Sequence, residues 1–265
     1  MEKLTRLVVT RPEKQAHTLL AKAKQEEILA LALPVLEIKA VEDAKQQEAI
    51  KTQILRFDEY QYALFVSQNA VQHAFTWLED YWPQLPKGIT YLAVGAKTEQ
   101  AVAEQLARFG ENDALASNTN SAMDSESLLQ HPALQKVDGT KILIFRGCGG
   151  RTKLYRELSA RGALVQQCDL YHRSLPKDAQ QALVAARLQP ASDLVALFSG
   201  ESLANFYQLL TQACVQHWQE IDLLLPGERV VEQARSLGFS RLHWAKNASE
   251  ESMWKSAQLL MQKIK

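Results

Sequence analysis

The stretch KILIFRGCGGRTKLYRELSARGALVQQCDLYHRSLP, residues 141–176, decides the fold that the sequence predicts. Its apolar run at residues 142–145 is typical of a strand buried on both faces. The glycines that follow allow the backbone to approach a ligand closely. A helix is predicted from about Thr152, and its unpaired N–H groups point back at the glycine turn. Together with a second strand at residues 164–170, this arrangement predicts an anion-binding corner.

The same alternation of short apolar runs and helical segments extends along the whole chain. Strand followed by helix, repeated, predicts an α/β fold with parallel sheets flanked by helices. About nine strands are expected, a number that suits two small sheets better than one. Near the start, a helix is expected from residue 13 to about 31 and a strand at 34–38. The other strands are expected at 7–10, 62–66, 90–94, 141–145, 164–170, 194–198, 222–225 and 242–244.

Two pairs of strand ends have the same spacing. Ser67 and Gly95 are 28 positions apart, and so are Ser199 and Gly227. An internal duplication explains the match, although βα units resemble one another in any case. The spacing leaves open whether two lobes are the continuous halves of the chain or exchange segments. The residues in corresponding positions are Ser67 and Ser199, Gly95 and Gly227, and Arg11 and Arg146.

Composition restricts the classes of partner. The 265 residues contain 30 basic and 30 acidic side chains, so no overall field attracts nucleic acid or a membrane surface. The first residues, MEKLTRL, carry charges where a secretory signal needs an apolar run. No run approaches the ~18 apolar residues of a membrane span. We therefore expect a cytoplasmic protein. We also expect a monomer, because no exposed apolar stripe stands out.

The cysteines and histidines give no metal-binding pattern. Cys148, Cys168 and Cys214 have no paired spacing, which suits a reducing compartment and argues against disulfides or a zinc site. The six histidines are scattered without a His-x-x-x-His pair, so no metal site is expected. Cys148 lies near a predicted helix N-terminus, which would lower its pKa, but a small inert residue is the preferred interpretation.

The glycine turn also invites a dinucleotide-binding interpretation. Gly147 and Gly149 follow a strand, and Asp169 lies near the end of the next strand, as a ribose-binding acid would. The third glycine of that fingerprint is replaced by Thr152, however, and no Gly-Lys-Ser/Thr of a P-loop occurs. The simplest alternative is a tight turn with solvated arginines on either side.

Two serines and a tyrosine at strand ends are ambiguous by themselves. Ser67 and Ser199 do not lie in Gly-x-Ser-x-Gly, so a helix N-cap is the simplest role for both. A tyrosine such as Tyr171 is usually partly buried packing. Beside Arg173 at a strand end, it is also a candidate general acid.

Taken together, the chain resembles the uroporphyrinogen-III synthase family over nearly its full length. The order and spacing of short motifs carry the resemblance, because none of them is specific by itself. One departure is Glu228, which stands where some members carry a threonine implicated in the site. The motifs are VTRP at 9–12, PVLEI at 34–38, FVSQNAV at 65–71, AVG at 93–95 with Thr98, RG at 146–147 with GR at 150–151, YHR at 171–173 with Pro176, and FSGES at 198–202.

The resemblance implies two flavodoxin-like lobes with a cleft between them and a two-stranded connector. It also implies that the lobes exchange segments. The first lobe would contain residues 1–37 and 174–265, and the second would contain residues 42–168. The connector strands would be residues 38–41 and 169–173.

The implied reaction converts the linear tetrapyrrole hydroxymethylbilane to uroporphyrinogen III, with inversion of the last pyrrole ring and loss of water. Such an enzyme is a carbon–oxygen lyase of haem biosynthesis that needs neither a metal nor an organic cofactor. Transient contact with the preceding enzyme of the pathway is a further expectation. Two alternatives stay open, a cofactor-free two-lobe binding protein or sensor and a dinucleotide-binding oxidoreductase.

The implied substrate carries eight carboxylates, so cationic side chains and backbone N–H groups at the strand ends are its expected partners. Tyr171 is the expected proton donor to the leaving hydroxyl, because a phenol stays protonated at neutral pH. The expected substrate-binding residues are Arg11, Ser67, Asn69, Ala70, Gly95, Thr98, Arg146, Gly147, Gly150, Arg151, Arg173, Ser199, Ser202 and Gly227.

Overall fold

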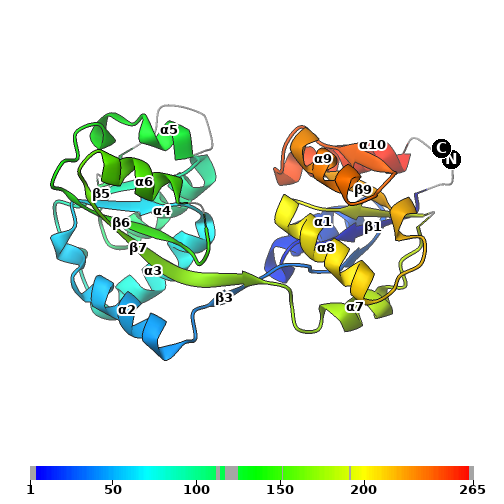
Figure 1. The fold of residues 1–265 in the computed structure, drawn as a ribbon, viewed down its shortest axis with the longest axis horizontal. Helices are drawn as coiled ribbons and strands as arrows, with labels where there is room; N and C mark the ends of the chain where they lie inside the picture. The colour runs from blue at the N-terminus through cyan, green and yellow to red at the C-terminus, as the bar shows by residue number, and fades with distance from the viewer. Residues whose placement is uncertain (1–3, 112–113, 117–124, 151, 191, 263–265) are drawn as a thin grey trace. The chain divides into compact units, whose positions relative to one another are not determined.

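The computed structural model describes residues 4–111, 114–116, 125–150, 152–190 and 192–262. The chain folds into two compact units (Figure 1). Unit 1 contains Met1–Glu37 and Ser174–Lys265, and unit 2 contains Ile38–Arg173. Within the described ranges, no helix is both long enough and apolar enough to cross a membrane.

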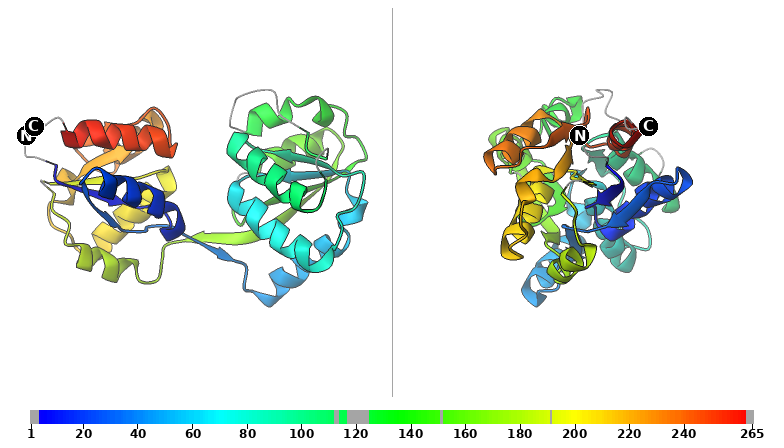
Figure 2. Two further views of the ribbon diagram at one scale, coloured as in Figure 1. Left: turned by 180° about the vertical axis from the view of Figure 1, so that it is seen from behind. Right: turned by 90° about the vertical axis from the view of Figure 1, so that its right-hand side faces the viewer.

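Unit 1 is a five-stranded parallel sheet with helices on both faces. Its strands, in spatial order, are β2 (Leu29–Ala32), β1 (Arg6–Val9), β8 (Asp193–Ala196), β9 (Asp222–Leu225) and β10 (Leu242–Trp244). Its helices are α1 (Glu13–Gln25), α7 (Ala179–Ala186), α8 (Gly200–Gln212), α9 (Glu228–Ser236) and α10 (Glu250–Gln262). Apolar side chains of α7, α8 and α9 pack on one face of the sheet, and those of α1 and α10 pack on the other. Figure 2, seen from behind, brings the blue α1 and the red α10 into view.

Unit 2 also has a five-stranded sheet covered by helices on both faces, and its strands β4, β5, β6 and β7 are parallel. Its strands, in spatial order, are β3 (Glu37–Ala40), β7 (Leu164–Ser174), β6 (Lys141–Gly147), β4 (Tyr62–Phe65) and β5 (Thr90–Ala93). Its helices are α2 (Ala44–Leu55), α3 (Gln68–Tyr81), α4 (Ala96–Arg108), α5 (Ser125–Leu129) and α6 (Lys153–Ala160). The helices α2, α3 and α4 cover one face, and α5 and α6 cover the other. The predicted α/β class, with parallel sheets flanked by helices, is confirmed.

The matched spacing in the sequence corresponds to matched places in the two sheets. Four neighbouring strands have the order β2-β1-β8-β9 in unit 1 and β7-β6-β4-β5 in unit 2. In this comparison β8 and β9 correspond to β4 and β5, and β1 and β2 correspond to β6 and β7. Ser67 and Ser199 both follow equivalent strands in extended conformation and both cap the next helix. Gly95 and Gly227 both begin the following helix with positive φ, at 83° and 133°, where a side chain would be strained.

Two expected elements near the start of the chain are wrong. The first helix ends at Gln25 and not near residue 31, because Glu27 adopts a left-handed conformation and the next four residues form β2. The expected strand at 34–38 is instead a coil followed by β3. Leu29 and Ala30 favour helices locally, but β2 pairs in register with β1, and these backbone hydrogen bonds outweigh the helix propensity.

Tyr91, in the core of unit 2, is the basis of a prediction about stability. The Tyr91 hydroxyl is buried and finds no hydrogen-bond partner within the described part of the chain, and burial raises its pKa. A buried hydroxyl without a partner costs roughly 1–3 kcal/mol of desolvation. Tyr91→Phe is therefore expected to leave the free energy of unfolding unchanged or to raise it by up to about 1 kcal/mol.

Tyr60→Phe is the matched control in the same unit, because the Tyr60 hydroxyl donates to Gln166 Oε1 at 2.5 Å. Its loss is expected to cost about 1 kcal/mol. Urea denaturation of the two variants measures the difference. A Tyr91→Phe variant that is destabilised as much as Tyr60→Phe would show that the Tyr91 hydroxyl is satisfied.

Candidate active site

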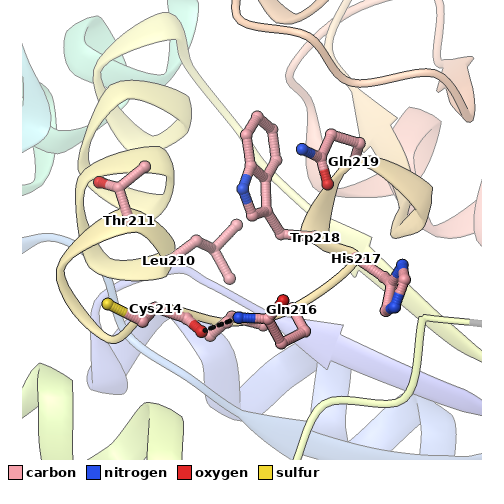
Figure 3. Close-up of a pocket in the computed structure, with 8 residues that line it drawn as sticks. Leu210, Thr211, Cys214, Gln216, His217, Trp218 and Gln219 are labelled. Atoms are coloured by element: carbon pink, nitrogen blue, oxygen red, sulfur yellow. Dashed lines mark hydrogen bonds between the residues drawn. The ribbon is translucent and has the colours of Figure 1, made fainter.

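The cavity that best fits a catalytic site lies in unit 2, at the carboxyl ends of its parallel strands, where α/β sheets bind ligands. Its volume is about 330 Å³. A more open depression of about 450 Å³ lies in unit 1 and is lined by Leu210, Thr211 and residues 214–219, including Cys214 and His217 (Figure 3). That depression lies at the far end of α8, away from the carboxyl ends of the strands, and we do not assign it a catalytic role.

Tyr171 is the central side chain of the unit 2 cavity. It is only 3% exposed, and its hydroxyl lies 2.9 Å from Ser67 Oγ. The register of β7 against β6 shifts at this point, so that Gly147 pairs with Tyr171 while Arg146 pairs with Asp169. Such a bulge re-aims a side chain. Here the bulge lies at Tyr171, whose phenol reaches Ser67 just after the end of β4.

Gly147 is required by the close approach of this ring. A Cβ atom at position 147 would lie 2.6 Å from Tyr171 Cε2, well inside van der Waals contact. The neighbouring backbone is also held, because the Cys148 N–H donates to the Tyr171 carbonyl over 2.8 Å. The glycine predicted to approach a ligand therefore approaches the tyrosine ring and lines the cavity.

Ser67 has two roles in the geometry of the site. As the N-cap of α3, its Oγ accepts a hydrogen bond from the Ala70 N–H over 3.1 Å. A hydroxyl has two acceptor positions and one donor, so it can also bond to the Tyr171 hydroxyl. Asn69 is half-buried in the first turn of α3, and the Ala70 side chain is fully buried.

Arg146 is buried beneath the glycine turn and lines the cavity. Its guanidinium donates to the carbonyls of Gly147 and Gly150 over 3.2 and 2.5 Å. Its Nε lies 3.0 Å from Asp169 Oδ1, in an ion pair without the alignment of a hydrogen bond. Asp169 is thus an ion-pair partner of Arg146, which weakens its interpretation as a ribose-binding acid.

The expected lowering of the Cys148 pKa is wrong. Desolvation by burial, together with the nearby Asp169 carboxylate, raises the pKa of the Cys148 thiol. The helix α6 begins only at Lys153, so its N-terminus is five residues away along the chain. The thiol contacts His172 Nε2 at 3.7 Å.

The other expected residues of unit 2 have varied settings. Gly95 caps α4, and Thr98 is 6% exposed, with its N–H bonded to the Gly95 carbonyl. Arg173 is exposed and lines the cavity. Arg151 lies outside the described residues. Two polar lining residues, Ser125 and Gln167, are not predicted from the sequence, because neither lies in a recognisable motif.

Unit 1 carries its own group of expected residues at the ends of β1, β8 and β9. Ser199 Oγ accepts from the Ser202 N–H over 3.0 Å, and the two hydroxyls are 2.9 Å apart. The Arg11 guanidinium lies 4.7 Å from the centre of the Phe198 ring and 3.7 Å from Glu250. Burial lowers the pKa of Arg11, but an arginine remains charged at neutral pH.

Comparison with known proteins decides the family. The model of the family described as "Uroporphyrinogen-III synthase HemD" matches residues 17–255. The chain belongs to the uroporphyrinogen-III synthase family. The uroporphyrinogen-III synthases of Salmonella typhimurium and Escherichia coli are each 29% identical to it, over 95% of this chain and 99% of theirs.

Solved structures support the same fold. A uroporphyrinogen III synthase from Thermus thermophilus matches with a TM-score of 0.60 and 18% identity, over 98% of this chain and 99% of that one. The Helicobacter pylori protein matches with a TM-score of 0.60 and 14% identity, over 98% of this chain and 100% of that one. Glu228, which the resemblance singles out, is an exposed residue in the first turn of α9.

Proposed function

We propose that the chain cyclises hydroxymethylbilane to uroporphyrinogen III and acts as a carbon–oxygen lyase that releases water. Membership of the family gives the reaction. The observation that carries the chemistry is the Tyr171 hydroxyl, which is held by Ser67 at the wall of a cavity that arginines also line.

The reaction first needs a proton for the leaving hydroxyl of the linear substrate. Loss of the protonated hydroxyl as water produces an electrophilic azafulvene. The last pyrrole ring then attacks through its substituted carbon, and the resulting spiro intermediate opens and closes with that ring inverted. Spontaneous closure gives the uninverted isomer, so the enzyme must hold a conformation that the substrate does not prefer in water. Positioning of this kind can supply on the order of 7–11 kcal/mol.

The contacts of Tyr171 suit a proton donor. When the Ser67 hydroxyl donates to the phenol oxygen, the phenol O–H is left to point at substrate. The negative charge that develops on the phenol oxygen then meets the Ser67 donor at the N-terminus of α3. The positive end of the helix dipole favours that charge.

The carboxylates of the substrate need cationic and N–H partners. Arg146 and Arg173 line the unit 2 cavity, and helices begin directly after Ser67 and Gly95. Unit 1 offers Arg11 together with the helix that Ser199 caps. Local groups of this kind allow a chain with no net charge to bind a polyanion.

Arg173→Gln is expected to raise KM about 3- to 10-fold, with kcat changed by less than about twofold, because a charge-assisted hydrogen bond is lost at an exposed site. The control is Arg235→Gln. Arg235 is an exposed residue in the last turn of α9 and forms an ion pair with Glu232. Steady-state kinetics measure both variants. A KM unchanged in Arg173→Gln and in Arg11→Gln would refute the role of these charges.

One assay tests the function itself. The protein is mixed with freshly generated hydroxymethylbilane, and the uroporphyrin isomers are resolved after oxidation. Isomer III is the expected product. Isomer I alone, at the spontaneous rate, would reject the proposal and favour a cofactor-free binding protein of the same fold.

A further inference from the structure

His73 is a second contact of Tyr171 that the proposed chemistry does not use. Its imidazole stacks on the phenol ring with 5.3 Å between the ring centroids and 23° between the ring planes. His73 is half-buried and is not one of the residues that line the cavity. It therefore contacts the proposed proton donor without lining the cavity.

The helix α3 holds the tyrosine at two points. Ser67, its N-cap, bonds to the hydroxyl, and His73, in the second turn, stacks on the ring. Residues three or four apart lie on one face of a helix, so Ser67, Ala70 and His73 share the face that meets Tyr171. Gly147, on β6, adds a third contact because no side chain separates its backbone from the ring.

We propose that His73 is a positioning residue for Tyr171, which fixes the plane of the phenol so that its hydroxyl stays bonded to Ser67 and open to the cavity. This inference rests on the proposed function, because it assigns to His73 an effect on the proton-donating step. A tyrosine ring turns about two side-chain bonds, and the Ser67 contact alone restrains only the oxygen end. Stacking restrains the ring itself.

The test compares His73→Leu, which removes the aromatic ring, with His73→Phe, which keeps a ring and removes the ionisable group. His73→Leu is expected to lower kcat for isomer III about tenfold with KM within about twofold, since misplacement of a reacting group acts on kcat. His73→Phe is expected to restore kcat to within about twofold of wild type. A wild-type kcat in His73→Leu, or a folded His73→Phe that is as slow as His73→Leu, would overturn the inference.

A spectroscopic measurement separates this inference from the function. In protein labelled with ¹³C-tyrosine, the Tyr171 ring signals are identified by their loss in Tyr171→Phe. His73→Leu is expected to shift those signals by removing the ring current of the imidazole, and His73→Phe is expected to keep a ring-current shift. If wild type makes only isomer I, the function fails while the shift still reports the stacking. If the shift changes but kcat does not, the positioning role alone fails.

Discussion

Tyr171→Phe is expected to lower kcat for uroporphyrinogen III formation by about 10²- to 10⁴-fold, the usual contribution of a positioned general acid. Phenylalanine fills the same space between His73 and Gly147, so the ring contacts remain. What disappears is the proton donor and its bond to Ser67. Stability is expected to fall by only about 1 kcal/mol, the typical value of one hydrogen bond.

The matched control is Tyr91→Phe, which removes the hydroxyl of another buried tyrosine of unit 2 that has no hydrogen-bond partner among the described residues. It is expected to keep the wild-type rate. Both rates are measured by separating isomers III and I at fixed times with freshly generated substrate. Formation of isomer III by Tyr171→Phe at near-normal rates would remove Tyr171 from the chemistry and leave it as a packing residue.

Asp193→Ala is expected to lower the free energy of unfolding by about 3 kcal/mol, the low end of the range for breaking a buried ion pair. Asp193 is fully buried at the start of β8 and accepts two bonds from Arg6, over 2.7 and 2.5 Å. It also accepts from the Gln189 N–H over 2.8 Å. The pair joins the neighbouring strands β1 and β8 of unit 1, and the carboxylate raises the pKa of the Arg6 guanidinium.

The low end of the range applies because the Arg6 side chain is 19% exposed and regains some hydration when its partner is removed. Glu232→Ala is the control, since it breaks an ion pair with Arg235 that is exposed to solvent on both sides. Urea denaturation followed by circular dichroism compares the two. A loss in Asp193→Ala no larger than in Glu232→Ala would show that the Arg6–Asp193 pair is not important for stability.

The sequence by itself determined the features that depend on neighbouring residues. Unbroken apolar runs such as residues 142–145 gave buried strands, because both faces of each sheet are covered by helices. The serines at 67 and 199 were predicted as N-caps, and each accepts the N–H three residues later. Equal spacing predicted equivalent strand ends, since each βα unit repeats the same local geometry.

Only the tertiary structure decided the contacts between distant residues. The strand β2 exists because β1 pairs with it, although its own residues favour a helix. Tyr171 meets Ser67 across 104 positions, and Arg6 meets Asp193 across 187. Arg146 lines the cavity and also donates to the carbonyls of the glycine turn, contacts that the sequence does not reveal. The physical reason is that strand pairing and burial choose these partners, and neither is encoded within one turn or one strand of the chain.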